Sequence, residues 1–558
     1  MTPDLIIRNG LVIDGTGAPG RIADVTVRDG KIAAIGTASG DARRVIDATG
    51  QVVAPGFIDP HTHYDAQIWW DADLTPSPWH GVTTVMMGNC GVGLAPCAPE
   101  SRVAVAHDLV NVEGIPYDVL EAGVTWTWES FPEFMQAADD RKPALNVGLL
   151  APLTTFRFAV MGDAATERTA NEDETAQITA LLDETMRQGA FGFSTTLIRN
   201  HVGYMGRPLA CKLASHDELR AYAGVLRKYG RGAIELALCQ STSIVGDAEM
   251  EMLDLLLSAS GRKVTWLALV DREDKPDACD ESLAKAADLI RRGAIPQIAV
   301  LPLTREFDLH TPHIFASFPS WHRAANRPVE EQLALFASRE FRDQFRAEMS
   351  GPSTFTGNWN SVRVADVADP ALKSLETKTI AAIAAERGCD GVDAILDIAV
   401  ADGMKTLFTA GVLNMNLGRV AKLVANPDTL IGLSDGGAHL GILCDAGYAT
   451  YVLGHWVREA KVLSLEQAVY RMTAQPAEMF GITDRGWLRE GLAADIVVFD
   501  PDTVGSMSRP EKRHDLPGGG KRFVMRSQGV SQTIVNGAVV YEAGEMTGVR
   551  SGRLIRAA

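Results

Sequence analysis

The chain has 558 residues, enough for several average domains or for one barrel with attachments. Apolar residues make up 46% and charged residues 22%, as in a soluble protein with a large core, and the formal charge of −17 argues against a nucleic-acid or anionic-membrane surface. No apolar run approaches the ~20 residues of a membrane helix. No signal peptide is visible, and seven irregularly spaced cysteines suggest reduced thiols, so we expect a cytoplasmic protein with no nucleic-acid or membrane partner.

The two ends of the chain carry alternating patterns that are typical of β-strands. Residues 1–55 contain a hairpin pattern around Asp29-Gly30, and residues 488–558 contain another around Asn536-Gly537. Because both ends differ from the middle in the same way, we predict that they build one small β-sandwich domain together.

Residues 56–487 alternate short apolar runs with helical patterns. Ser215 with Glu218, and Ser464 with Gln467, form predicted capping boxes at the starts of two helices. Eight strand-like runs lie at 56–59, 83–87, 146–150, 191–194, 233–237, 264–268, 297–301 and 430–434. Eight strands alternating with helices predict an α/β fold, a (β/α)8 TIM barrel.

The longest interruption of this alternation lies at about 303–428, between the seventh and eighth predicted strands. An insertion after the carboxyl end of a barrel strand lies over the mouth where chemistry occurs, so this segment is a candidate lid. A surface excursion with its own small core is the alternative interpretation.

The strongest chemical signal is the pair His61 and His63 at the end of the first predicted barrel strand. Side chains alternate along a strand, so both imidazoles point the same way and can reach one metal ion. Cys90 follows the second strand between glycines, where a thiolate can approach a metal, although free cysteines are more often small buried hydrophobes. Asp435 follows the eighth strand, where a carboxylate can ligate a metal and accept a proton from its water.

Four further residues are weaker candidates. Glu235 faces the barrel interior by strand alternation, and is either an extra metal ligand or a buried carboxylate paired with a core Arg or Lys. Arg199 and His201 follow the fourth strand and are candidate substrate contacts, since Arg offers a planar fork for a carboxylate. His439 lies four residues after Asp435 and either contacts substrate or is a plain loop histidine.

In these residues and their order the chain resembles the amidohydrolase superfamily, and within it the N-acyl-D-amino-acid deacylase (D-aminoacylase) family. The matching motifs span nearly the whole chain: Phe57-Ile58-Asp59-Pro60-His61-Thr62-His63, Gly81-Val82-Thr83-Thr84-Val85, Gly88-Asn89-Cys90-Gly91, Gly192-Phe193-Ser194-Thr195, Ser434-Asp435-Gly436-Gly437-Ala438-His439 and the run Gly491 to Asp500. The resemblance implies a zinc barrel in which His61, His63 and Asp435 surround one position, Cys90 reaches towards a second, and Asp435 is the general base.

The chain departs from the family pattern where the family carries one histidine at the end of the fifth strand and another at the end of the sixth. Residues 233–239 and 264–270 contain no histidine. We therefore expect one zinc ion per chain, held by His61, His63, Asp435 and either Cys90 or Glu235, because a thiolate alone is too few ligands for a second tetrahedral site. Complete loss of the metal is the alternative.

The predicted function is metal-dependent hydrolysis of a C–N bond in a small-molecule amide, with an N-acyl amino acid implied by the resemblance. One alternative is a cyclic-amide hydrolase of the hydantoinase-like branch, although no lysine of the kind which that branch carbamylates lies in the strand runs. The other is a catalytically silent scaffold for ligand binding or assembly. The sequence leaves open the substrate's acyl group, side chain and stereochemistry, and whether the protein forms a homo-oligomer.

Overall fold

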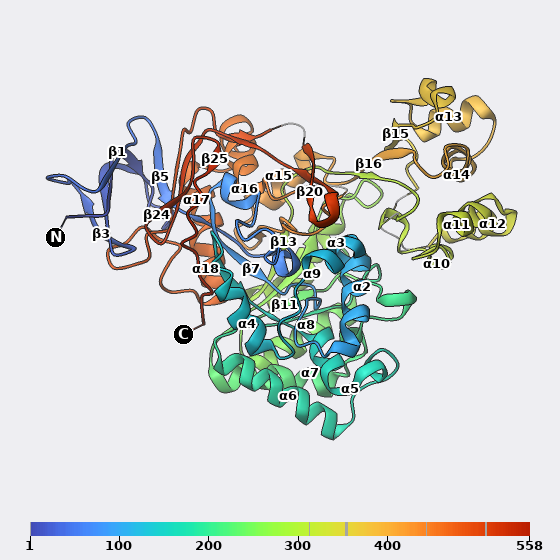
Figure 1. Ribbon diagram of the computed structural model, residues 1–558, viewed down its shortest axis with the longest axis horizontal. Helices are drawn as coiled ribbons and strands as arrows, with labels where there is room; N and C mark the ends of the chain where they lie inside the picture. The colour runs from blue at the N-terminus through green and yellow to red at the C-terminus, as the bar shows by residue number, and fades with distance from the viewer. Residues whose placement is uncertain are drawn as a thin grey trace.

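The computed structural model describes residues 2–311, 313–351, 355, 357–441, 444–507 and 510–557. Figure 1 shows strands from both ends of the chain on the left, a body of strands and helices in the middle, and an insertion on the right. Among the helices of the described residues, none has both the length and the apolar character that a membrane crossing requires.

The terminal strands form one nine-stranded sheet in the order β25-β24-β23-β18-β5-β1-β2-β3, with β4 paired to β1. The bounds are β1 (Leu5–Val12), β2 (Arg21–Arg28), β3 (Lys31–Gly36), β4 (Arg44–Asp47), β5 (Val52–Pro55), β18 (Ile496–Phe499), β23 (Val530–Val535), β24 (Ala538–Glu542) and β25 (Glu545–Met546). The antiparallel pair β5–β18 joins the two chain ends. Both predicted hairpins form, because Asp29-Gly30 and Asn536-Gly537 all take the positive φ that a tight two-residue turn needs.

The body contains two parallel sheets, which together include all eight predicted strand regions. One has the order β6-β7-β8 and the other β17-β13-β12-β11-β10-β9. The bounds are β6 (Phe57–Asp59), β7 (Val82–Met87), β8 (Asn146–Leu149), β9 (Ala151–Pro152), β10 (Gly192–Thr196), β11 (Ala233–Ala237), β12 (Val264–Leu269), β13 (Ala294–Ile298) and β17 (Leu430–Ile431). Only Leu150 separates β8 from β9, and a parallel bridge between Thr62 and Gly436 links the residues that follow β6 and β17. Residues at the carboxyl ends of β6 and β17 therefore lie together.

Two predicted strands differ from the structure by three residues at an end. β13 begins and ends three residues before the predicted run 297–301, whose apolar end is buried beyond the strand, where the Trp456 indole N–H donates to the Val300 carbonyl at 2.9 Å. β17 stops at Ile431 because Leu433 and Asp435 adopt positive φ, which a strand does not accommodate. The apolar pattern therefore predicted which residues are buried, but it did not predict where the strands end.

The predicted helix caps are present. Ser215 and Glu218 form a reciprocal capping box at the start of α7 (His216–Tyr229), and Ser464 and Gln467 do the same for α17 (Leu465–Met472). The other main helices of the body are α2 (Arg102–Glu113), α3 (Tyr117–Gly123), α4 (Phe131–Asp140), α5 (Leu153–Met161), α6 (Glu172–Arg187), α8 (Asp247–Ser260), α9 (Ala278–Arg291), α15 (Leu417–Ala425) and α18 (Ala474–Phe480).

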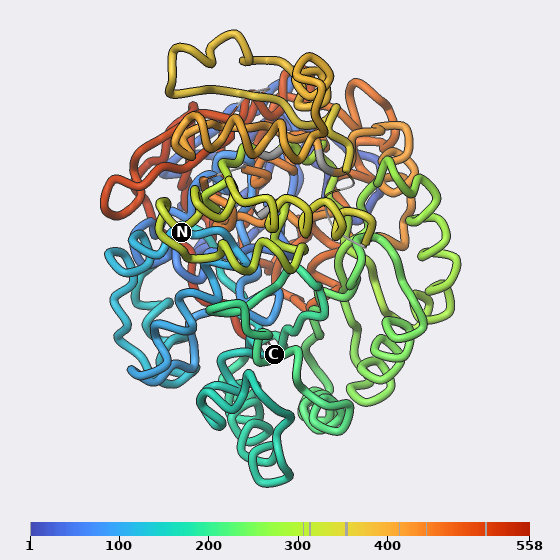
Figure 2. The backbone as a smooth tube through the Cα atoms, turned by 90° about the vertical axis from the view of Figure 1, so that its right-hand side faces the viewer, coloured from blue at the N-terminus to red at the C-terminus, as the bar shows by residue number. Residues whose placement is uncertain are grey.

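The insertion has its own sheet and its own core. Strands β14 (Leu303–Phe307), β16 (Leu407–Leu413) and β15 (Val362–Asp366) pair antiparallel, and the helices are α10 (Pro319–His322), α11 (Val329–Ala337), α12 (Arg339–Glu348), α13 (Ile380–Arg387) and α14 (Gly391–Ala401). Phe315 and Trp321 stack with ring centroids 4.8 Å apart inside a separate cluster of buried aromatic residues. Turned by 90°, the molecule presents the insertion helices across its front (Figure 2).

Candidate metal centre

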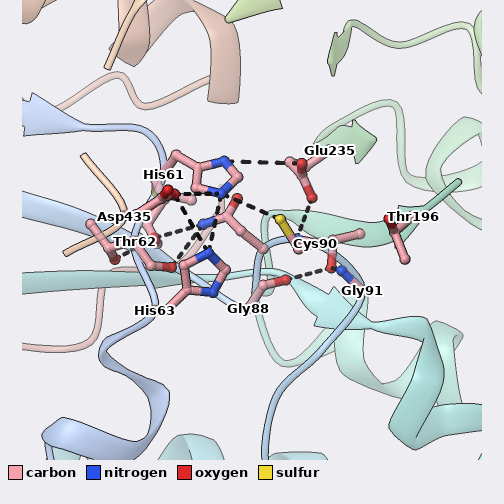
Figure 3. Close-up of polar contacts among 12 residues, drawn as sticks. His61, Thr62, His63, Gly88, Cys90, Gly91, Thr196, Glu235 and Asp435 are labelled. Atoms are coloured by element: carbon pink, nitrogen blue, oxygen red, sulfur yellow. Dashed lines mark hydrogen bonds and ion pairs between the residues drawn. The ribbon is translucent and has the colours of Figure 1, made fainter. Parts of the chain in front are cut away.

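The four residues predicted to hold a metal lie together at the carboxyl ends of β6, β7 and β17. The Nε2 atoms of His61 and His63 are 3.2 Å apart, and the Cys90 thiol lies 3.5 Å from His61 Nε2 (Figure 3). The Asp435 carboxylate oxygen Oδ1 lies 3.5 Å from His61 Nε2 and 3.8 Å from His63 Nε2. Tetrahedral ligands about 2.1 Å from an ion lie about 3.4 Å from one another, so His61 is spaced from His63, Cys90 and Asp435 as zinc ligands are. The ligand atoms of His61, His63 and Cys90 all lie within 4.8 Å of one another, and Asp435 lies outside this group of three.

Backbone hydrogen bonds hold the two histidines in this arrangement. The His63 N–H donates to the Gly436 carbonyl at 2.7 Å, and the Thr62 N–H donates to the Met86 carbonyl at 3.1 Å. The end of β6 is therefore fixed to β7 on one side and to the segment after β17 on the other. Since residues 61 and 63 share one face of this extended backbone, both imidazoles point at the same place.

Several non-glycine residues at the candidate metal centre have positive φ, which is rare for residues with a side chain. Cys90, Leu433, Asp435 and His439 all have φ between 48° and 56°. Each such conformation costs about 1–3 kcal/mol, and these conformations cluster at functional sites. Gly437 is required next to them, because a Cβ there would lie 2.6 Å from the His63 carbonyl oxygen.

Both metal-site histidines are neutral at pH 7. Burial lowers the pKa of His61 to about 3 and holds the pKa of His63 well below its usual value. A neutral imidazole carries the lone pair that a metal needs, so these rings could bind a cation without first losing a proton.

Glu113, which the sequence did not indicate, faces the second ring nitrogen of His63. Its Oε1 atom lies 3.3 Å from His63 Nδ1, and its backbone carbonyl accepts the His439 N–H. Glu113 is the last residue of α2 and is buried. A carboxylate in the last turn opposes the helix dipole, and this unfavourable position was the one sequence feature that could have marked it.

Glu235 lies on β11 behind His61. Its Oε2 atom accepts the Cys90 N–H at 2.7 Å, and its Oε1 atom lies 4.0 Å from His61 Nδ1 (Figure 3). Among the contacts of the described residues, its partners are therefore Cys90 and His61 rather than the core Arg or Lys considered from the sequence. Its carboxylate therefore holds the Cys90 backbone and lies beside one imidazole, on the side opposite Asp435 (Figure 3).

The acidic groups here form a cluster that favours a cation. Burial raises the pKa values of Cys90, Glu113 and Glu235 well above their usual ranges, and repulsion from Asp435 raises all three further. Within the described residues, His61, His63 and Cys90 form the one group of histidine, cysteine or acidic residues whose ligand atoms lie close enough for an ion. Two neutral imidazoles, a thiol and a carboxylate are the donors that zinc prefers, so the residues present fit this metal.

A cavity of about 160 Å³ opens onto the candidate metal centre. Its polar lining includes His63, Cys90, Glu113, Asp435, Asn111, Asn200, Thr242, His201 and His439, and its apolar lining includes Leu267, Leu303, Leu413 and Leu433. Two of the three predicted substrate contacts, His201 and His439, thus face the cavity, and His201 Nδ1 lies 2.9 Å from the Thr196 hydroxyl. Arg199 is exposed and is not among the lining residues.

Comparisons with known proteins place the chain in a family. The sequence profile described as the amidohydrolase family matches residues 44–297 and 341–541. An N-acyl-D-glutamate deacylase from Alcaligenes xylosoxydans xylosoxydans is 30% identical over 566 residues, covering 99% of this chain and 96% of the relative. The crystal structure of an N-acyl-D-glutamate deacylase from Bordetella bronchiseptica, complexed with zinc and a phosphonate inhibitor, covers 100% of both chains at 27% identity with a TM-score of 0.69. A D-aminoacylase structure covers 99% of this chain and 100% of that chain at 28% identity with a TM-score of 0.68. That structure was reported for the role of its binuclear metal centre, with activation by one metal and attenuation by the second.

Proposed function

The chain belongs to the amidohydrolase family and is a hydrolase of carbon–nitrogen bonds other than peptide bonds, and we propose that it removes the acyl group from N-acyl-D-amino acids. The observation that carries this proposal is the convergence of His61, His63, Cys90 and Asp435 at the carboxyl ends of parallel strands. The acylated D-amino acids named for its full-length relatives support the substrate class.

We propose that one zinc ion is held by His61, His63 and Asp435, with Cys90 close by as a weaker partner, which would leave a position open for water. When bound, zinc supplies Lewis-acid activation of water and of the amide carbonyl. The Glu113 carboxylate lies 3.3 Å from His63 Nδ1 and the Glu235 carboxylate 4.0 Å from His61 Nδ1, and their negative charge would favour a proton on each Nδ1 and leave each Nε2 free for the ion.

In the same proposal Asp435 is the general base. Its side chain is 24% exposed and lines the cavity, whereas His61 and His63 are almost fully buried, so it is the acidic ligand that a substrate and its attacking water can reach. Asp435 accepts the proton of the water and returns it to the nitrogen of the leaving amine. His201 and His439 are positioned in the cavity lining to contact the substrate.

We further propose that the parallel strands close into a (β/α)8 barrel over residues 56–487, with the insertion at about 303–428 as a lid. The bridge between Thr62 and Gly436 and the short step from β8 to β9 support closure at both joints. Residues 1–55 and 488–558 would then form the accompanying sandwich domain around the nine-stranded sheet. Seven free cysteines support the cytoplasm as its compartment.

Elemental analysis together with an activity screen tests the proposal. The purified full chain should contain one zinc ion and should hydrolyse N-acyl-D-amino acids faster than their L-enantiomers after zinc addition. Cys90→Ser should lower zinc affinity modestly with one ion still bound. Two tightly held zinc ions would contradict the one-ion proposal, and activity on neither enantiomer would contradict the proposed reaction.

A further inference from the structure

A second cavity, of about 90 Å³, lies between the body and the insertion. The body contributes Val110 and Asn111 from α2 and Val202 from the segment after β10, and the insertion contributes Ala316, Trp321 and Ala325 among others. The metal centre uses none of the residues that line only this second cavity.

The two cavities share part of their lining. Asn111, Asn200 and Ala316 border both the 90 Å³ cavity and the 160 Å³ cavity that contains Asp435. Ala316 belongs to the insertion, so the insertion contacts the space beside the candidate metal centre. The two cavities are therefore adjacent, with these three residues at their common border.

The second cavity is suited to an apolar group. Val110, Val202, Ala324, Ala325 and the Trp321 ring provide carbon surface, and no charged residue is among its lining residues in the described part of the chain. Apolar surface removed from water by such a wall stabilises a bound alkyl group.

Three of the polar side chains of this lining already have partners. His310 Nδ1 lies 2.7 Å from the Gln332 amide oxygen, His322 Nε2 lies 3.0 Å from the Ala316 carbonyl, and the Asn111 amide donates to the Gly203 carbonyl at 2.9 Å. A polar ligand group would have to displace these bonds, whereas an alkyl group would leave them intact.

The Trp321 ring, which borders the second cavity, is held in place by contacts with other aromatic rings. It stacks on Phe315 at 4.8 Å and contacts Phe336 at 5.0 Å and Phe341 at 5.4 Å, all inside the core of the insertion. A wall fixed in this way discriminates ligands by size, because it cannot collapse around a smaller group.

We propose that this cavity is a distal subsite that binds a short alkyl group of the amide substrate, carried either by the acyl chain or by the amino-acid side chain. The inference rests on the proposed function, since it assumes that the amide bond lies at Asp435. Each methylene buried there is expected to raise kcat/KM about fourfold.

Two substrate series measured with the zinc-loaded full chain test the subsite. One series lengthens the acyl group on D-alanine from acetyl to hexanoyl, and the other enlarges the side chain of N-acetyl-D-amino acids from alanine to leucine. The series that enters the subsite should show rising kcat/KM, which identifies the end of the substrate that binds there.

Ala325→Leu fills the subsite from an exposed position, and Ala334→Leu on α11 is the matched control, because Ala334 is also exposed but lines neither cavity. Ala325→Leu should lower kcat/KM about tenfold for the longest substrate of the responsive series and leave N-acetyl-D-alanine unchanged. Ala334→Leu should change neither. Two flat series, or equal effects of the two variants, would overturn the proposal.

A binding measurement separates failure of the subsite from failure of the proposed reaction. Calorimetry on chelator-treated full chain, which cannot turn over substrate, should show tighter binding of the longest responsive substrate than of N-acetyl-D-alanine, and Ala325→Leu should abolish the difference. If the zinc-loaded wild type hydrolyses no amide, calorimetry with the longest member of each series still decides. Equal binding of the long and short compounds would overturn the subsite.

Discussion

Two regions of the molecule bury histidine completely and use it in different ways. His80 has a partner at each ring nitrogen, with Thr450 Oγ1 2.7 Å from Nδ1 and the Met525 carbonyl 2.9 Å from Nε2. At His61 and His63 the Nε2 atoms instead face each other, a thiol and a carboxylate. Burial lowers the pKa of His80 to about 4, so its ring is neutral, as are those of His61 and His63.

The difference teaches which observation identifies a metal site. Burial and a lowered pKa are common to both regions, so neither separates a structural histidine from a ligand. Convergence of several ligand atoms on one point is found only at His61 and His63 among the described residues. At His80 the ring connects the segment before β7 to residues near 450 and 525, which is a structural role.

The largest expected effect comes from exchanging these histidines. His61→Ala and His63→Ala should each abolish zinc binding and amide hydrolysis while the fold survives, because each removes a ligand that no neighbour replaces. His80→Asn should retain both zinc and activity. Elemental analysis, turnover and circular dichroism of the three variants check this, and wild-type turnover in either alanine variant would exclude that residue from the site.

Asp435→Asn should retain part of the zinc but lower kcat about 10²–10⁴-fold, because an amide coordinates weakly and cannot accept the proton of water. Steady-state kinetics at saturating zinc measure the loss, with His80→Asn as the comparison. If more than about half of the activity remained, the base would lie elsewhere, and Glu235 would be the next residue to examine.

Glu113→Gln tests the carboxylate behind His63. Zinc affinity should fall about 10–100-fold, the usual effect of changing the partner behind a metal-ligating imidazole, because the substitution removes the negative charge beside His63. Glu121→Gln on α3 is the matched control, because Glu121 is exposed. Competition with a zinc chelator measures both affinities, and equal values would mean that Glu113 does not position His63.

The smallest expected effect is the acid stability that depends on His80. Its folded pKa of about 4 lies below its ordinary value of 6.5, so between pH 6.5 and pH 4 the unfolded chain binds a proton that the folded chain does not. Stability is therefore lost as the pH falls through this window, by roughly 2 kcal/mol between pH 7 and pH 5 from this group. His80→Asn should show a smaller fall in Tm over that interval than the wild type. An equal fall would show that His80 is not buried in its neutral form.

The sequence by itself determined much of the fold and which four candidate metal ligands come together. Alternation and turn chemistry located the eight parallel strand regions, the two hairpins and the two capping boxes, because these depend on neighbours a few residues apart. His61, His63, Cys90 and Asp435 could be predicted to meet because each follows a strand, and parallel strands bring their carboxyl ends to one edge.

Only the tertiary structure decided which other side chains reach that edge. Glu113 approaches His63 from the end of a helix, and Ala316 borders the same cavity from an insertion more than 200 residues after His63 in sequence. Arg199 looked equivalent to His201 but is exposed while His201 lines the cavity. Helix ends, loops and insertions have no period that fixes their direction, so long-range packing determines where their side chains point.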